Sequence, residues 1–267
     1  MRAPLTAWVE GVGVLGPGLP DWPSAAQVLS ARVPYEARPT VIPPLECLPP
    51  AERRRTGKVV RLALRAGLEA VALAGAEASA LPAVFTSSGG DGENCHEICQ
   101  ALAGTDRQIS PTRFHNSVHN AASGYWGIAT GATAPVNALC AYDASFGAGL
   151  LEALAQIRTE ETAVLLVAYD ADYPEPMRSV RPIPDAFAVA LLLTPVARPG
   201  SLARLTASLC PAPAHALTDP QLESLRAQVP AARSLPLLRQ IASAETGTVV
   251  IDYLGSQRVQ LEVSPCH

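Results

Sequence analysis

A short stretch in the middle of the chain, PVNALCAYDASFGAGLLEAL (residues 135–154), offers three side chains for nucleophilic chemistry: Cys140, Asp143 and Ser145. A thiol at the first turn of a helix would be the most reactive, because the helix N-terminus stabilises thiolate and its free N–H groups can hold an oxyanion. A carboxylate favours the same pole but attacks a thioester poorly, and a serine needs a neighbouring base. The place of each residue on strand, turn or helix therefore decides what it can do.

The pattern of this stretch predicts a strand that turns directly into a helix. Apolar residues recur at helical spacing from Phe146 onward, and Asp143 stands where an N-cap accepts the free N–H groups of the first turn. Cys140 falls inside the strand, where a buried, unreactive thiol is expected. Ser145 lies in the first turn with no evident base beside it, which is typical of a packing serine. We expect Asp143 to cap the helix and none of the three to be catalytic.

Composition limits the class of protein and of partner. The chain has 267 residues, of which 48% are hydrophobic and 16% charged, enough for one large buried core. A net charge of -4 gives no basic face for nucleic acid, and no apolar run reaches the roughly 18 residues of a membrane span. The N-terminal residues lack the features of a signal peptide, so we expect a cytoplasmic protein. The six cysteines are scattered, which indicates buried thiols rather than a disulfide framework.

Strand and helix patterns alternate along most of the chain. Apolar runs typical of buried strands occur in LTAWVEGVGVLGPG, PAVFTSSGG, PVNALCAY, AVLLVAYD and DAFAVALLLTP. Such repeated units predict an α/β fold with a mainly parallel sheet between helices over residues 1–210. Beyond that, a helix opens at Asp219 and Pro220 and a hairpin turns around Gly255. We expect residues 211–267 to form a small C-terminal appendage of helix plus β-hairpin.

Two clusters approach metal-binding motifs without completing them. His115 and His119 stand four residues apart, as in a helical zinc motif, but an asparagine takes the place of the glutamate that serves as base. Cys95 and Cys99 share one helical face beside His96, but no second pair follows to complete four ligands. We expect no metal ion and no other cofactor.

The order of these motifs resembles the N-terminal half of the β-ketoacyl synthases, which have the thiolase fold. The resemblance runs from WVEGVGVLGPG through FTSSGG and SPTRFHNSVHNAASGYWGIATGATAP to VLLVAYD and PDAFAVALLLTP, and its most specific matches are Asn120, Gly124, Gly131 and Pro135. In that family the nucleophilic cysteine lies eight residues after the proline that Pro135 resembles, and this count lands on Asp143. Counting back from VLLVAYD, which resembles the strand after the nucleophile helix, also reaches Asp143. The resemblance thus implies that a carboxylate occupies the nucleophile's place.

The other groups of a synthase site are missing as well. The synthases that this chain resembles take two histidines and a lysine from their C-terminal half, in stretches like HGTGT and a Gly-rich NSFGFGG, and neither stretch occurs here. The only lysine is Lys58, and the histidines after the nucleophile helix are His215, in a Pro-rich linker, and His267. The resemblance therefore implies a protein that cannot perform the decarboxylating condensation on its own.

Within this family an inactive relative, the chain-length factor, pairs with an active synthase. The resemblance implies a heterodimer with a cognate β-ketoacyl synthase, contact with an acyl carrier protein through that complex, and a place in pathways such as those of aryl polyenes and dialkylresorcinols. It also implies that the strand before the helix pairs across the dimer and that side chains of this protein close the partner's acyl tunnel. The candidate tunnel and interface residues are Phe114, His115, Val118, His119, Asn120, Pro135 and Cys140.

Three alternatives stay open. Phe114 is compatible equally with a tunnel floor and with an ordinary core. An acyltransferase or hydrolase would use Cys140 or Ser145 with His115 or His119 as base. A purely structural subunit would stabilise a synthase without setting chain length.

Overall fold

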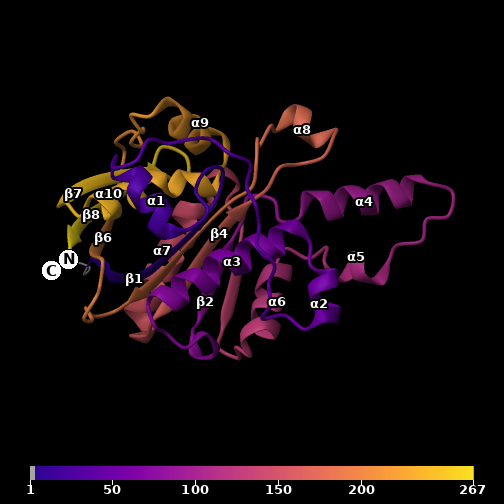
Figure 1. Ribbon diagram of the computed structural model, residues 1–267, viewed down its shortest axis with the longest axis horizontal. Helices are drawn as coiled ribbons and strands as arrows, with labels where there is room; N and C mark the ends of the chain where they lie inside the picture. Colours follow the sequence, from indigo (N-terminus) through magenta and orange to yellow (C-terminus); the bar gives the residue numbers. More distant parts are fainter. Residues whose placement is uncertain (1–3, 267) are drawn as a thin grey trace.

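The strands of the computed structural model, which describes residues 4–266, form a single eight-stranded sheet (Figure 1). Their order across the sheet is β3-β2-β4-β5-β1-β6-β8-β7, so β3 and β7 are its two edges. The strands are β1 (Leu5–Leu15), β2 (Ala83–Thr86), β3 (Val136–Leu139), β4 (Val164–Asp170), β5 (Phe187–Thr194), β6 (Ala203–Cys210), β7 (Gly247–Asp252) and β8 (Arg258–Pro265).

The direction of the strands corrects one prediction. The α/β class is confirmed, but the sheet is not mainly parallel: β2 runs parallel to β3 and β4, and every other neighbouring pair is antiparallel. A continuous apolar run indicates burial on both faces and carries no information on direction. Between β4 and β5, residues 171–186 hold only the short helix α8 (Met177–Val180). No long crossover helix covers the sheet there, and the chain returns antiparallel.

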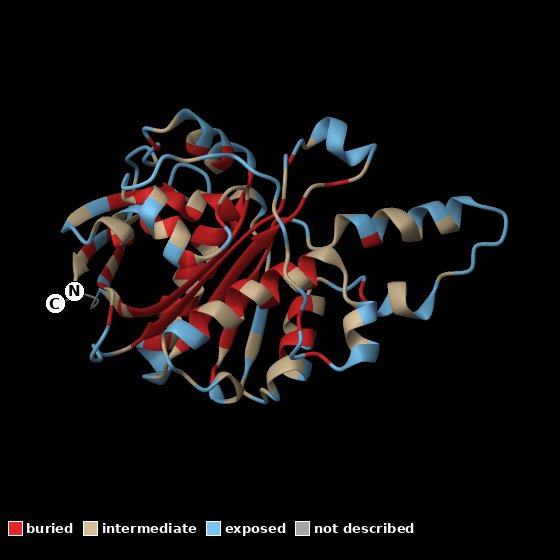
Figure 2. Ribbon diagram, viewed as in Figure 1, coloured by how far each residue is buried: buried red, intermediate tan, exposed pale blue. Residues whose placement is uncertain are grey.

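Helices cover both faces of the sheet, and the central strands are buried between them (Figure 2). Leu166 of β4 enters one core and its neighbours Leu165 and Val167 enter the other, as the two-residue period of a strand requires. The first core packs against α1 (Trp22–Leu29), α7 (Ser145–Glu160), α9 (Pro220–Gln228) and α10 (Leu235–Ser243), and the second against α3 (Lys58–Leu73) and α6 (Ala121–Thr130).

The two glycines near the start of α7 fix how closely that helix approaches the sheet. A Cβ added to Gly149 would come within 2.7 Å of Cγ2 of Thr86, and one added to Gly147 within 2.5 Å of the main-chain oxygen of Asp252. Larger residues would push the helix away from the ends of β2 and β7. The N-terminus of α7 is therefore held in a defined position over the sheet.

The C-terminal segment continues the same sheet instead of standing apart from it. The predicted hairpin is present as β7 and β8, and β8 pairs with β6 from Ala203 opposite Pro265 to Cys210 opposite Arg258. Helix α10 places its apolar side chains in the core that also holds α7.

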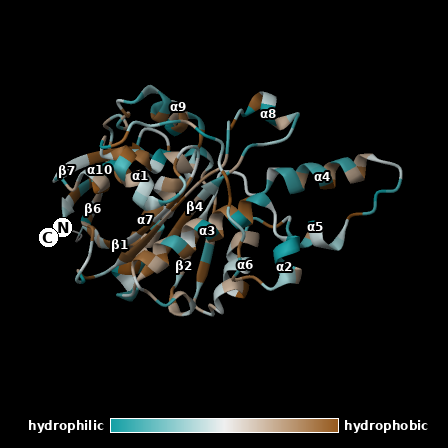
Figure 3. Ribbon diagram, viewed as in Figure 1, coloured by the Kyte–Doolittle hydropathy of each residue, from teal (hydrophilic) through white to brown (hydrophobic). Residues whose placement is uncertain are grey.

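Three helices lie at the end of the molecule next to β3. Helices α4 (Gly92–Ala103) and α5 (Pro111–His115) extend away from the body as an arm, with α2 (Pro50–Arg55) near its base (Figure 1). Among the residues of α4, only Asn94 is buried. Within residues 4–266, no helix combines the length and the apolar character needed to cross a membrane. Hydropathy is mixed along the arm, whereas brown apolar strands fill the body (Figure 3).

Candidate functional site

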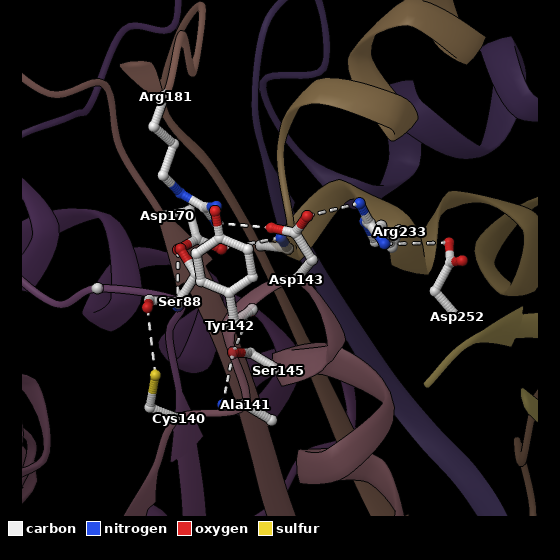
Figure 4. Close-up of polar contacts among 12 residues, drawn as sticks. Ser88, Cys140, Ala141, Tyr142, Asp143, Ser145, Asp170, Arg181, Arg233 and Asp252 are labelled. Carbon is white, nitrogen blue, oxygen red and sulfur yellow. Dashed lines mark hydrogen bonds and ion pairs between the residues drawn. The ribbon is translucent and has the colours of Figure 1, made fainter. Parts of the chain in front are cut away.

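The junction between β3 and α7 carries the three residues that the sequence analysis singled out (Figure 4). The chain leaves β3 through Cys140, forms a 3₁₀ turn (Tyr142–Ala144) and enters α7 at Ser145. At the end of β2, Thr86 Oγ1 donates to the main-chain oxygen of Ser145 at 2.9 Å. Because β2 runs parallel to β3 and β4, the carboxyl ends of the three strands lie at the same end of the sheet. Open α/β sheets place their functional groups at this end.

Asp143 does not cap the helix, which corrects the prediction. The N-cap of α7 is Ala144, which has no side chain able to accept a hydrogen bond. The carboxylate of Asp143 accepts instead from two guanidinium groups, with Arg181 Nη2 at 2.6 Å and Arg233 Nη2 at 3.1 Å (Figure 4). Charge-assisted hydrogen bonds of this kind are roughly twice as strong as those from neutral N–H groups, so the two arginines outcompete the helix for the carboxylate.

The two arginines connect Asp143 to distant segments of the chain. Arg181 lies in the loop between β4 and β5, and Arg233 follows α9 and also pairs with Asp252 at 3.6 Å. Burial alone would lower the pKa of Arg181, but its hydrogen bond and proximity to Asp143 outweigh burial and raise the pKa. We call this cluster of Asp143, Arg181, Arg233 and Asp252 the arginine clamp. A carboxylate neutralised on both oxygens is a poor nucleophile.

Ser145 is buried, and its hydroxyl forms hydrogen bonds with the main chain. Its Oγ donates to the main-chain oxygen of Tyr142 at 2.7 Å and accepts from the N–H of Ala141 at 3.1 Å. In the described part of the chain, neither bond leads to a histidine or carboxylate that would activate the hydroxyl. The predicted packing role of Ser145 fits this arrangement.

Cys140 is exposed, so the prediction of a buried strand thiol is wrong. Its Sγ donates to the main-chain oxygen of Ser88 at 3.2 Å. β3 is an edge strand, and the other side of Cys140 has no neighbouring strand to cover it within residues 4–266. The broader expectation of buried thiols also fails: four of the six cysteines are exposed and two are partly buried.

Asp170 is a buried carboxylate that sequence reasoning missed. It ends β4 and accepts from the N–H and Oγ of Ser88 at 2.8 and 2.6 Å and from the N–H of Ala231 at 2.9 Å. Burial raises its pKa to about 6, although the hydrogen bonds from Ser88 and Ala231 and the charge of Arg181 oppose the rise. Its only sequence signal is an aspartate at the end of a wholly apolar run.

The predicted tunnel residues gather on an exterior surface. A groove of about 610 Å³ is lined by residues of α5, α6 and the loop between them, including Phe114, His115, Val118 and Asn120. Phe114 is 68% exposed and Val118 is 53% exposed. Phe114 is therefore not an ordinary core residue. Pro135 is exposed as well, directly before the edge strand β3.

The candidate bases His115 and His119 contact groups other than the candidate nucleophiles in the described residues. His119 Nε2 contacts the main-chain oxygen of Ser87 at 3.2 Å, and the His115 ring lies edge-on to Tyr125 with ring centroids 6.2 Å apart. Among residues 4–266, no hydrogen bond joins either histidine to Cys140 or Ser145. The ammonium group of Lys58 pairs with Asp172. His267 lies outside the described residues.

Comparison with known proteins assigns the fold and the family. The family described as "Beta-ketoacyl synthase, N-terminal domain" matches residues 22–252. A chain in the structure of ketosynthase ApeO with its chain length factor ApeC, from Xenorhabdus doucetiae, is 26% identical, with a TM-score of 0.73 over 96% of this protein and 99% of that chain. No curated protein matches.

Two further solved structures share the fold at lower identity. A chain of the ishigamide ketosynthase/chain length factor is 13% identical, with a TM-score of 0.73 over 98% of this protein and 100% of that chain. A chain in the AntDE:AntF complex of a ketosynthase with its acyl-carrier protein is 11% identical, with a TM-score of 0.74 over 99% and 100%. These matches confirm the thiolase-like fold, and with the family match over residues 22–252 they establish that the protein belongs to the β-ketoacyl synthase N-terminal domain family.

Proposed function

We propose that this protein is a non-catalytic, chain-length-factor-like partner of a β-ketoacyl synthase. In this role it completes a heterodimer and shapes the acyl tunnel of the partner, which performs the chemistry. The observation that carries the proposal is the arginine clamp: the position that the resemblance assigns to the nucleophile holds a carboxylate whose oxygens are occupied by Arg181 and Arg233.

The edge strand β3 supports a partner on this side of the molecule. Two of its four residues are exposed and none is buried, and its outer edge pairs with no strand of the described chain. A bare edge presents N–H and C=O groups that template pairing with another chain. Phe114, Val118 and Ile128 add exposed apolar surface on α5, α6 and the loop between them, and α6 contacts β3. Apolar surface beside a free strand is the combination that a stable heterodimer buries.

The similar structures support the identity of that partner. The chain that is 26% identical comes from a complex of a ketosynthase with its chain length factor, and near-complete coverage of both chains means that the likeness extends over the whole of each. An acyl carrier protein would then meet this protein through the complex, and the pathway would be of the polyene type that the resemblance implies.

The direct test is co-expression with the ketosynthase from the same gene cluster. We expect a stable one-to-one complex that buries more than about 1,600 Å², whereas the protein expressed alone self-associates through its bare edge. A protein that stays monomeric beside that synthase would rule the proposal out.

The tunnel role has its own test. In the complex, Phe114→Ala should shift the products to longer chains without abolishing synthesis, since a fixed aromatic wall limits length by sterics while the partner keeps its active site. Val180→Ala is the matched control, because Val180 is 82% exposed on α8. An unchanged product distribution would remove Phe114 from the tunnel and leave a purely structural subunit.

The competing enzyme function predicts a covalent intermediate. Incubation with an acyl thioester, followed by intact-mass spectrometry, should show no acyl adduct on this chain, because Ser145 is bonded to the backbone and no base among residues 4–266 is hydrogen-bonded to Cys140. An adduct that Cys140→Ala or Ser145→Ala abolishes would favour an acyltransferase or hydrolase.

A further inference from the structure

Tyr142, at the start of the 3₁₀ turn, has an unusual backbone conformation. Its φ of 52° lies in the left-handed region, which a bulky L-residue rarely adopts. Two other non-glycine residues with positive φ, Glu161 and Ala244, are the C-caps of α7 and α10, where this conformation ends a helix. Tyr142 precedes a helix instead, so helix termination does not explain its conformation.

The surroundings of Tyr142 hold it in this conformation. The buried hydroxyl of Ser145 bonds to the main chain on both sides, to the oxygen of Tyr142 and to the N–H of Ala141. The guanidinium carbon of Arg181 lies 3.8 Å from the centre of the Tyr142 ring, and Arg181 is itself fixed by Asp143 (Figure 4). Strained residues persist only where such contacts over-determine them, and they cluster at functional positions.

These contacts do not bury the ring. Tyr142 remains 62% exposed, and its hydroxyl has no hydrogen-bond partner among residues 4–266. It lies three residues after the end of the edge strand β3 and two residues from the exposed Cys140. The chain thus presents a rigid aromatic side chain, stacked on a fixed cation, in the turn that follows its edge strand.

We infer that Tyr142 is an anchor residue of the interface with the ketosynthase, which rests on the proposed function. A matching site on that subunit would be an apolar pocket with a polar group for the hydroxyl. Tyrosine is among the residues that dominate binding energy at interfaces, because it buries a large area at a low cost in side-chain entropy. The stack on Arg181 lowers that cost further, since the ring is already oriented before binding.

Binding to the co-expressed ketosynthase tests this inference. The purified complex is diluted, and its dissociation constant is measured by mass photometry. Tyr142→Ala should raise the dissociation constant about 30-fold or more, the range of an interface hot spot. Tyr142→Phe should give a smaller rise, because it keeps the ring and loses only the hydroxyl. Leu254→Ala is the matched control: Leu254 is 51% exposed in the turn after β7, at the opposite edge of the sheet.

Tyr142→Gly separates binding from folding. Glycine adopts a φ of 52° without strain, so this variant should melt at or above the temperature of the wild-type protein and still bind as weakly as Tyr142→Ala. If the wild-type chain binds and the alanine and glycine variants bind within about threefold of it, Tyr142 is no anchor and the proposed function stands. If the wild-type chain fails to bind, the proposed function itself falls.

Discussion

At the scale of single residues, the carboxylate that the resemblance assigns to the nucleophile's place is part of an ion-pair network. Asp143 holds together three segments that are remote in sequence: the turn before α7, the loop that carries Arg181 and the segment that carries Arg233. Its position at the strand-to-helix junction could be read from the sequence. Its partners could not, because Arg181 and Arg233 lie 38 and 90 residues away with no motif around them.

Substitution of Asp143 distinguishes the clamp from a helix cap. Asp143→Asn should lower the free energy of unfolding by about 1–2 kcal/mol, because it leaves the largely buried guanidinium group of Arg181 without its anion and that of Arg233 with only Asp252. Asp143→Ala should cost at least as much. Urea unfolding measures both, with the exposed Asp106→Asn as the control, expected within about 0.5 kcal/mol of the wild-type protein. A neutral Asp143→Asn would instead favour a cap, which tolerates asparagine.

Asp170 should make stability depend on pH. Its pKa is about 6 in the folded state, against about 3.9 in an unfolded chain. Between these values the folded state holds the proton more tightly, so this group's contribution to stability falls as pH rises from about 4 to about 6 and stays low above that. Asp170→Asn keeps one side-chain oxygen, so it loses either the bond from Ala231 or the two from Ser88 at every pH. It should also abolish this pH-dependent contribution, which amounts to about 3 kcal/mol in total.

The comparison uses urea unfolding at pH values between about 4.5 and 7.5, for the wild-type protein and Asp170→Asn. The informative quantity is the difference between the two free energies of unfolding, since other groups titrate in both proteins. A difference that stays constant over this range would mean that the Asp170 carboxyl is not shifted.

At the scale of elements, β3 offers a defined main-chain register to a partner. The main-chain oxygens of Pro135 and Leu139 accept from Ala83 and Ser87 on the β2 side. Because groups alternate along a strand, the N–H of Asn137 also faces β2, while that of Ala138 faces outward.

This alternation gives a matched pair of proline variants. Ala138→Pro should leave the fold intact and weaken the complex with the ketosynthase about tenfold or more, because it removes an outward donor and no bond to β2. Asn137→Pro should lower the melting temperature, because it removes a bond to β2. Circular dichroism and co-purification provide the two measurements. Unimpaired assembly of the Ala138→Pro protein would mean that the partner does not pair with this edge.

Much of the element order could be predicted from the sequence, and the reasons for the failures are specific. The apolar runs located β1, β2, β4 and β5, because a strand buried on both faces leaves a continuous signal. Helices α1 and α10 were not predicted, since each is short and has a proline at its second position, which is equally typical of a loop. Strand direction and the exposure of Cys140 depend on which strand lies next to which, and local patterns do not contain that information.

At the scale of the whole molecule, the sheet runs without a break from β3 to β7. The first 210 residues and the last 57 share it, and both contribute side chains to the same core. Continuity of this kind favours a single cooperative unfolding unit.

Hydrogen exchange in low denaturant tests this cooperativity. Amides of β1 and β8 should open with the same free energy, measured by mass spectrometry of the peptides that cover each strand. If β7 and β8 open at a clearly lower free energy than β1, residues 211–267 form the separate appendage that the sequence pattern predicts.

The arginine clamp also limits how this protein can evolve. A cysteine placed at position 143 alone would leave Arg181 without its anion and Arg233 with only Asp252, and loss of either arginine alone would remove one of the two partners of Asp143. Substitutions within one charge network are not additive, so each first step toward a reactive site carries a stability cost before any benefit. A cysteine-based site at this position would therefore require several coupled substitutions, whatever role selection favours.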